Sequence, residues 1–387
     1  MAKVGVLVFV GEGGSSEVER MVAEGQQAAT LDTVERVLAT GLCDPVIVCT
    51  DSLALSEQLR TWPVIVELHR EPFHFGRRLR ALIEKHRVEF PFYLGGGSAP
   101  LFSQAELAQV CQTLLHLERG VISNNFYSAD FAAFAPGQAI ASVPLPAIDN
   151  DLAFLLASQA GLPSLSLPRS ASTQMDVDTP IDLAVLVFHP ALGPHLRRYL
   201  SGLSLNLPQI TKVMACLTDQ DSEVVFAGRV SSHVWSYLEK EAACRKRVFS
   251  EERGMRASGR EERAKVVSLL GMYLQSVGPW AFFRSLGSLG HAAVIDTRVI
   301  FQHLGLRLSA PDRFNSDLLR VDAIADPYLK EFTAAALEAP IPVLLGGHSV
   351  VAGGLLALIE AAWAHCDQPR GAIPPSATAA GADASGA

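Results

Sequence analysis

Apolar runs alternate with amphipathic stretches through the first half of this chain. Residues 4–10 form a continuous apolar run of buried-strand length, which ends in a glycine-rich segment, residues 11–16. An amphipathic stretch at 30–40 then predicts a helix. The same order recurs, with strands predicted at 45–50, 64–68 and 90–94 and helices at 75–86 and 103–117.

This succession of strand, loop and helix predicts an α/β fold with a doubly wound, mostly parallel sheet. Because crossovers between parallel strands are right-handed, the loops that follow the strands gather at one edge of the sheet. Ligands bind at that edge in open α/β sheets. The helix predicted at 103–117 has its own start signal, since Ser103 and Glu106 have the spacing of a capping box.

The pattern changes after Pro190 to long helical stretches with few clear strands, and helices are predicted at 231–249, 279–289 and 326–337. A chain of 387 residues is also too long for one ordinary core. We therefore expect an α/β domain over residues 1–190 and a mainly helical domain over residues 191–367. Residues 368–387 lack core-forming side chains and are expected to be disordered.

Composition and charge narrow the function classes. Charged residues make up 19% of the chain and hydrophobic residues 49%, which is typical of a packed globular protein. A net charge of -8 without a basic stripe argues against a nucleic-acid partner. With no apolar segment of about twenty residues, we expect no membrane partner. The six cysteines lack C-x-x-C spacing and are expected to be buried, reduced thiols of a cytoplasmic protein. A homodimer is the oligomeric state we consider.

The most informative stretch is Gln-Met-Asp-Val-Asp-Thr-Pro-Ile-Asp-Leu, residues 174–183. Its first half alternates apolar and acidic residues as a half-buried strand end does, and Thr179 followed by proline predicts the cap of a helix. Asp176 and Asp178 would then stand at the carboxyl edge of a strand. The alternative is a capped turn whose acids are merely solvated, and the motif by itself leaves both interpretations open.

This motif resembles the closing motif of nucleotidyltransferases with a glycosyltransferase-A-like fold, such as molybdopterin cytidylyltransferases and 2-phospholactate guanylyltransferases. The resemblance covers roughly residues 3–190 and includes two further places. The loop at 11–16 stands where the family keeps its phosphate-cradling loop. Residues 93–101 stand where a family strand ends in an acidic metal ligand before Pro-Leu, and Ser98 or Gly96 occupies the position of that acid.

The resemblance implies a nucleoside triphosphate and a phosphorylated small metabolite as partners, with Mg²⁺ as the cofactor. It places Mg²⁺ on Asp176 and Asp178, with Asp178 also catalytic. Nucleotide contacts would come from a larger set of residues: Gly11, Gly13, Gly14 and Ser15 for the phosphates, Ser98 beside them, and Asn124 for the base or sugar. The amides of the segment at 122–130 could hydrogen-bond a base or sugar edge, and the segment at 148–151 repeats this combination of acids and amides. The alternative is that both segments are ordinary loops, in which asparagine and aspartate are common.

The chain also departs from the family pattern, since the first loop has Glu12 and Glu17 where basic residues are usual. Arg20 is the nearest cation, and residues 24–27 contain glutamines where a lysine is expected. Transfer of a phosphoryl-type group depends on neutralising charge, so a working enzyme would recruit Arg20 or the basic residues at 77–80. A nucleotidyltransferase and a catalytically degenerate nucleotide- or metabolite-binding protein both remain open.

A third possibility is an enzyme whose site lies in the second half. Polar residues interrupt apolar stretches there at Asp296, Arg298, Arg313 and at the pair His348 and Ser349. That pair lies in a glycine-rich turn between a strand predicted at 342–345 and an apolar helix. Arg298, Arg313 and Ser349 would bind an anion, and His348 would act as a general base. The alternative is that Asp296 with Arg298, or Arg313 with Asp317, forms a buried ion pair. A ligand site in a cleft between the two domains is the expectation.

Overall fold

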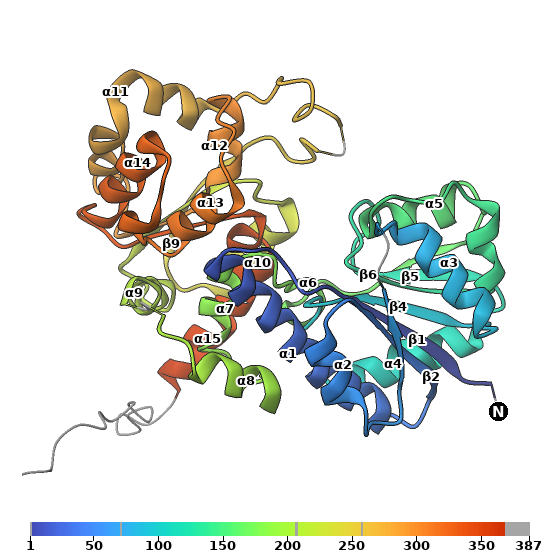
Figure 1. Ribbon diagram of the computed structural model, residues 1–387. Coiled ribbons are helices and arrows are strands. Elements are labelled where there is room, and N and C mark those ends of the chain that lie inside the picture. Colours follow the sequence, from blue (N-terminus) through green and yellow to red (C-terminus); the bar gives the residue numbers. More distant parts are fainter. Residues whose placement is uncertain (1, 70–71, 206–207, 257, 368–387) are drawn as a thin grey trace, which may run out of the picture.

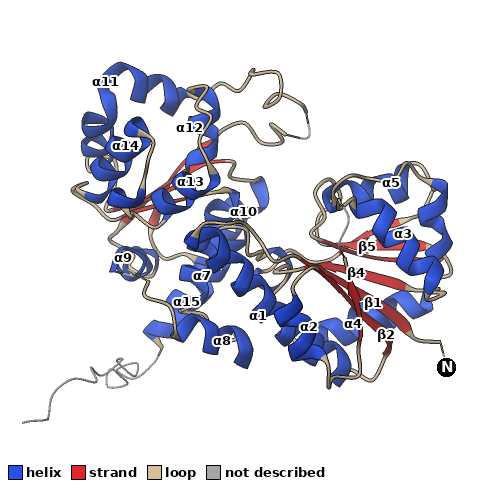
Figure 2. Cartoon of the chain, viewed as in Figure 1, coloured by secondary structure: helices blue, strands red, loops and turns tan. Residues whose placement is uncertain are grey.

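The computed structural model describes residues 2–69, 72–205, 208–256 and 258–367, which form two lobes (Figure 1). The segment predicted to be a disordered tail, 368–387, lies outside the described residues. Each lobe is built on its own sheet, and helices pack between the two sheets (Figure 2).

A seven-stranded sheet organises the first lobe, in the order β3-β2-β1-β4-β6-β5-β7. Only β6 runs antiparallel to its neighbours, so the predicted doubly wound, mostly parallel sheet is confirmed. The strand order reverses between β1 and β4, and this topological switch point is where such sheets bind ligands. The strands are β1 (Val4–Val10), β2 (Cys43–Thr50), β3 (Ile65–Leu68), β4 (Pro91–Gly95), β5 (Gly120–Ser123), β6 (Phe131–Ala135) and β7 (Ser164–Ser166).

Helices cover both faces of this sheet because side chains of β1 alternate between two cores. Val6 and Val8 lie in one core with residues of α1 and α4, whereas Leu7 and Phe9 lie in the other with residues of α3 and α5. The helices of the lobe are α1 (Glu17–Ala39), α2 (Leu53–Leu59), α3 (Phe75–Lys85), α4 (Gln104–His116), α5 (Leu152–Ser158), α6 (Ala171–Gln174) and α7 (Pro180–Leu186).

Capping decides where two of these helices begin. The predicted capping box of Ser103 and Glu106 starts α4 and is confirmed. A second box, formed by Ser16 and Glu19, starts α1 at Glu17, well before the predicted residue 30. The first turns of α1 were missed because its buried face there consists largely of small residues such as Ala23 and Gly25.

The second lobe contains helices, as expected, but they surround a four-stranded parallel sheet, in the order β11-β10-β8-β9, of which the pattern predicted only the last strand, β11. Its strands are β8 (Glu223–Gly228), β9 (Arg245–Ser250), β10 (Ala292–Asp296) and β11 (Val343–Gly346). The helices after α7 are α8 (Pro194–Ser201), α9 (Pro208–Leu217), α10 (Ser232–Glu241), α11 (Leu269–Leu286), α12 (Thr297–His303), α13 (Ala310–Asp317), α14 (Pro327–Leu337) and α15 (Gly353–Cys366).

The helix predicted at 231–249 is wrong, since α10 ends at Glu241 and the chain continues into the edge strand β9. Arg245 and Arg247 lie on the exposed side of β9. Charged residues at a sheet edge protect it from pairing with a further strand. In the sequence, the same charged residues continue the polar face of the predicted helix, which is why its end was placed too late.

One hydrophobic core joins the lobes, because it contains Met21 of α1, Leu183 of α7, Phe226 of β8 and Leu355 of α15. The two lobes therefore share buried surface, and the last helix returns to pack against α6 and α7. Within the described ranges, no helix combines the length and the apolar character needed to cross a membrane. All six cysteines are free, although Cys366 is exposed and not buried as expected.

Candidate functional site

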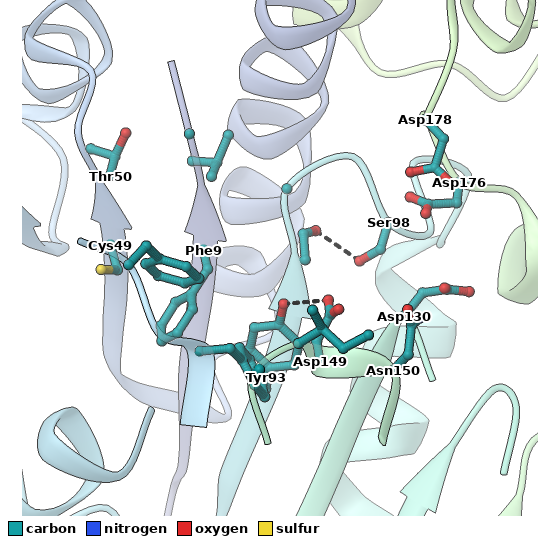
Figure 3. A pocket seen from close by; sticks show the side chains of 18 of the residues that line it. Phe9, Cys49, Thr50, Tyr93, Ser98, Asp130, Asp149, Asn150, Asp176 and Asp178 are labelled. Carbon is teal, nitrogen blue, oxygen red and sulfur yellow. Dashed lines mark hydrogen bonds between the residues drawn. The ribbon is translucent and has the colours of Figure 1, made fainter. Parts of the chain in front are cut away.

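A cavity of about 590 Å³ opens at the carboxyl ends of β1, β2 and β4, beside the switch point of the first sheet. Its volume lies within the range of small-molecule sites. Aromatic side chains line one part of it and acidic side chains another (Figure 3). The aromatic residues are Phe9, Phe73, Phe75 and Tyr93, and the acidic residues are Asp51, Asp130, Asp149, Asp176 and Asp178.

The aromatic part of the cavity is held rigidly by ring contacts. Phe9 meets Phe75 and Tyr93 edge-to-face, with ring centroids 5.8 and 5.3 Å apart. Phe75 and Tyr93 also contact each other at 4.7 Å. These contacts keep an apolar surface at the base of the cavity, which suits the burial of a flat ring system.

The motif at 174–183 is confirmed as a helix start but not as a strand end. Thr179 caps α7, and its backbone N–H and hydroxyl both donate to Asp182, each at 2.8 Å. The preceding residues pair with the loop after β4 instead of with a strand, since the N–H of Val177 donates to the carbonyl of Gly97 at 3.2 Å. Ser98 and Asp176 form an isolated bridge there.

The predicted alternation of the motif nevertheless holds. Met175 and Val177 are buried, whereas Asp178 is exposed and Asp176 is partly exposed, and both carboxylates line the cavity (Figure 3). Gln26, at the place of the expected lysine, donates to the carbonyl of Val177 at 2.7 Å. The amide thus anchors the acidic segment to α1.

Two further acids, Asp130 and Asp149, line the same part of the cavity as Asp176 and Asp178, and these four residues form what we call the acidic wall. Asp130 and Asp149 were not predicted as site residues from the sequence. Asn124 donates to the Asp130 carboxylate at 2.7 Å and accepts its backbone N–H at 3.1 Å. The Tyr93 hydroxyl donates to Asp149 at 2.7 Å. Asn124, predicted to contact a base or sugar, is therefore occupied in positioning an acid. The signal was present in the repeated acids and amides of segments 122–130 and 148–151.

Desolvation and mutual repulsion raise the pKa values of the four carboxyls Asp130, Asp149, Asp176 and Asp178. Burial raises the pKa of Asp130 to about 7, and the charges of Asp178 and Asp149 contribute. The surrounding protein likewise raises the pKa values of Asp149, Asp176 and Asp178, although Asp178 retains exposed surface, and for Asp176 the repulsion from Asp178 is the second cause. Such a set of crowded carboxyls is stabilised by a cation that balances their charge.

The acidic wall fits Mg²⁺ chemically, since carboxylate oxygens are its preferred ligands and one or two of them usually suffice when phosphates and water complete the shell. Asp176 and Asp178 lie close enough for a hydrogen bond between them to lower the pKa of Asp178. Among the described residues, the one tight group of three possible ligands is elsewhere, at Asp32, Glu35 and His195. Asp32 there accepts the N–H groups of His195 and Leu196 at 2.9 Å, as a helix cap does.

The glycine loop contributes less surface to the cavity than predicted, because Gly11 lines it but Gly13, Gly14 and Ser15 do not. The N–H of Glu12 donates to Asp51 at 2.7 Å. Gly13 has a φ of +87°, and a Cβ there would stand 2.3 Å from the Cβ of Ala23. The glycine at 13 is thus required by packing on α1, whatever the loop binds.

Gly11→Val tests the loop without this complication. A Cβ at position 11 would meet its nearest atom, an Oδ of Asp51, at 3.8 Å, which is ordinary contact. We expect the free energy of unfolding to change by less than about 1 kcal/mol, while the branched side chain obstructs the cavity and weakens triphosphate binding at least about tenfold. Calorimetric titration and urea denaturation give the two values, and undiminished affinity would remove the loop from the site.

The expected replacement cations do not line the cavity. Arg20 donates to the carbonyl of Ser15 at 3.1 Å, and Arg78 donates to the Cys49 sulfur at 3.3 Å. Arg256 lines the cavity instead, from the loop between β9 and α11 that extends towards the first lobe (Figure 1). Its charge lowers the pKa of Asp178.

In the second lobe, ion pairs form with partners other than those expected. The Arg298 guanidinium donates to Asp317, with Nη1 at 2.9 Å from one carboxylate oxygen, and Arg229 donates to Asp296, with Nη2 at 3.0 Å. Asp296 and Asp317 are fully buried or nearly so. These pairs have the character of structural contacts.

Three other predicted residues of this lobe lie beside those pairs. Arg313 is partly exposed, His348 is exposed, and the buried hydroxyl of Ser349 lies beside Asp182. Burial and the charge of Asp178 raise the pKa of Asp182 to about 7, and Ser349 opposes this rise. Although His348 retains solvent-accessible surface, the surrounding protein and the charge of Arg229 lower its pKa to about 4. His348 is therefore neutral at pH 7.

Comparison with known proteins gives only distant likenesses, since no family model and no curated sequence matches this chain. Among solved structures, CMP:2-keto-3-deoxy-manno-octonic acid synthetase complexed with CTP matches at 14% identity and a TM-score of 0.35, covering 47% of this chain and 95% of that one. A cytidylyltransferase from Leptospira borgpetersenii matches at 12% identity and a TM-score of 0.39, covering 53% of this chain and 100% of that one. Likenesses this low carry no argument about chemistry.

Proposed function

We propose that the cavity of the first lobe binds a nucleoside triphosphate together with a divalent cation, and that the protein transfers the nucleoside monophosphate to a phosphorylated small molecule. The observation that carries the proposal is the acidic wall of Asp130, Asp149, Asp176 and Asp178 beside an aromatic surface at the switch point of the sheet. A flat base suits the aromatic part, and metal-bound phosphates suit the acidic part.

In the proposed transfer, an oxygen of the acceptor phosphate forms a bond to the α-phosphorus, and the bond from that phosphorus to the β-bridging oxygen breaks. Pyrophosphate leaves with its electron pair. Asp176 and Asp178 would hold Mg²⁺, which when bound supplies positive charge to the phosphate oxygens. Arg256 would neutralise charge on the leaving pyrophosphate, and the aromatic side chains would exclude water.

The molybdopterin cytidylyltransferase and 2-phospholactate guanylyltransferase families remain the proposed relatives of the first lobe, with the phosphate-binding loop reduced to Gly11 and its neighbours. A catalytically degenerate nucleotide-binding protein is the second candidate. One contact favours it, because Asp51 already occupies the N–H of Glu12 in the loop where phosphate would bind.

A thermal-shift series of the four nucleoside triphosphates with Mg²⁺ tests binding, and a pyrophosphate-release assay with phosphorylated acceptors tests transfer. We expect one triphosphate to raise the unfolding temperature in a Mg²⁺-dependent manner and to yield pyrophosphate with an acceptor. Binding without pyrophosphate from any acceptor would favour the degenerate candidate. If no triphosphate raised the unfolding temperature, both candidates would be wrong.

A further inference from the structure

The sheet of the second lobe has a switch point of its own. β9 lies beyond β8 on one side, and β10 and β11 lie on the other, so the strand order reverses between β8 and β10. All neighbouring strands are parallel, and their carboxyl ends share one edge. Open parallel sheets bind ligands in the crevice at this position. The residues that follow β8 and β10 here are Arg229 and Thr297, with Arg298 next.

Glycines keep the backbone of this edge close together. Gly228 has a φ of +120°, and a Cβ there would lie 2.4 Å from the Cβ of Asp296. Gly347 follows β11, and a Cβ there would make ordinary contacts with Thr179 at 3.6 Å and with Nε of Arg298 at 3.9 Å. The end of β11 therefore lies against both Thr179 and Arg298.

The charge of this edge is positive beyond its ion pairs. Arg229 and Arg298 are balanced by Asp296 and Asp317. Arg313, however, makes a single hydrogen bond within the described part of the chain, from Nε to the carbonyl of Ser309 at 3.4 Å. Burial and the neighbouring positive charge of Arg298 lower the pKa of Arg313, and the charges of Asp317 and Glu261 oppose this shift only in part. An anion beside Arg313 would offset the repulsion from Arg298.

This edge faces the acidic wall of the first lobe. The charges of both Arg256 and Arg229 act on Asp178, and the segment that carries Asp178 continues into Thr179 beside Gly347. One short segment thus borders both switch points. A ligand held at the second edge would approach a nucleotide held in the cavity.

We propose that the edge formed by Arg229, Arg313, Gly347 and His348 binds the phosphate group of a small phosphorylated metabolite. Arg313 would supply paired N–H donors, Arg229 would supply the N–H groups that Asp296 leaves free, and His348 would donate one N–H as a neutral imidazole. The proposal that this edge binds phosphate does not depend on the proposed function of the first lobe. As the acceptor site of the transfer, it rests on the proposed function.

The test uses the full chain without nucleotide and with chelator, so that the metal-dependent cavity is not loaded. Glycerol phosphate, inorganic phosphate and glycerol are titrated separately, with ³¹P line broadening or calorimetry as the measurement. We expect glycerol phosphate to bind and glycerol not to bind. Arg313→Ala should weaken binding about tenfold, and His348→Gln should weaken it less, because one charge-assisted contact exceeds one neutral contact.

Arg284→Ala, at an exposed arginine near the end of α11, is the matched control and should bind like the parent. Asp178→Asn should also retain phosphate binding, which separates this site from the nucleotide cavity. The proposal is overturned if the parent binds no glycerol phosphate, if inorganic phosphate alone binds, or if Arg256→Ala abolishes binding while Arg313→Ala and His348→Gln do not. Failure of every triphosphate titration with phosphate binding intact would overturn the transfer but not this site.

Discussion

Arg298→Ala is expected to lower the free energy of unfolding by about 3–5 kcal/mol, because it leaves the buried carboxyl of Asp317 without its partner. The Arg298 side chain is itself only 11% exposed, so water replaces it poorly. Urea denaturation at pH 7 measures the loss. A loss below about 1 kcal/mol would show that the pair does not hold the second lobe together.

The same variant should be more destabilised at high pH than at low pH. Burial raises the pKa of Asp317 in the folded protein above its unfolded value, and Arg298 opposes this rise. Removing Arg298 therefore raises the folded pKa further, so the folded state binds more protons than the unfolded state over a wider range. Stability then falls as pH increases from the unfolded pKa through the folded one. Denaturation at pH 5 and pH 8 checks the sign.

Two controls separate charge from packing in this experiment. Arg320→Ala removes an exposed pair with Glu17 at 3.3 Å and should cost less than about 1 kcal/mol. Replacing both partners, as in Arg298→Met with Asp317→Leu, should recover most of the loss, since no charge is then left buried without a partner. His348→Gln, at an exposed position, should leave stability unchanged within about 0.5 kcal/mol.

Asp178→Asn is expected to weaken Mg²⁺-dependent triphosphate binding at least about tenfold, because one of two carboxylates that would hold the cation is lost. The fold should not suffer. Although Asp178 retains exposed surface, the surrounding protein and the charge of Asp149 raise its pKa, which means that its ionised form is less favourable in the folded state than in the unfolded state. Removing the charge should leave stability unchanged or slightly higher.

Calorimetric titration of triphosphate with and without Mg²⁺, together with urea denaturation, gives both results. Asp51→Asn is a matched control, because Asp51 lines the same cavity but accepts the N–H of Glu12 outside the acidic wall. We expect a smaller effect of that variant on Mg²⁺ dependence. Should Asp178→Asn bind the metal-bound triphosphate like the parent, the motif would be only a helix cap with solvated acids.

The local pattern determined the first sheet well, because each element there carries its own signal. The run at 4–10 is buried on both faces, as a central parallel strand must be, and it became β1. Ser103 with Glu106, and Thr179 before Pro180, satisfy backbone groups within one turn, so their effect does not depend on distant residues. The alternation around Asp176 likewise survived, since burial of Met175 and Val177 decides it.

The second sheet was decided by tertiary structure. The glycine-rich turn after residue 345 marked β11 as a strand. β10 has only five residues, a length at which an apolar run does not distinguish strand from helix, and β9 is an edge strand with charged residues. Their parallel partners lie far away in the sequence, as for β8 with β10 and β10 with β11. In the sequence, the helical periodicity of the long helices around these strands was the stronger signal, so this half was predicted to be mainly helical.

Which residues belong to the candidate sites was also decided by contacts between segments far apart in the sequence. Asp130, Asp149 and Arg256 reach one cavity from separate loops, and their approach is set by strand order and lobe packing. The Arg298 guanidinium pairs with Asp317, nineteen residues away, and not with the nearby Asp296, whose carboxylate accepts hydrogen bonds from the guanidinium of Arg229. The sequence therefore indicated which segments carry functional polar residues. Which charged residues pair with each other depends on which strand ends lie together at the edges of the two sheets.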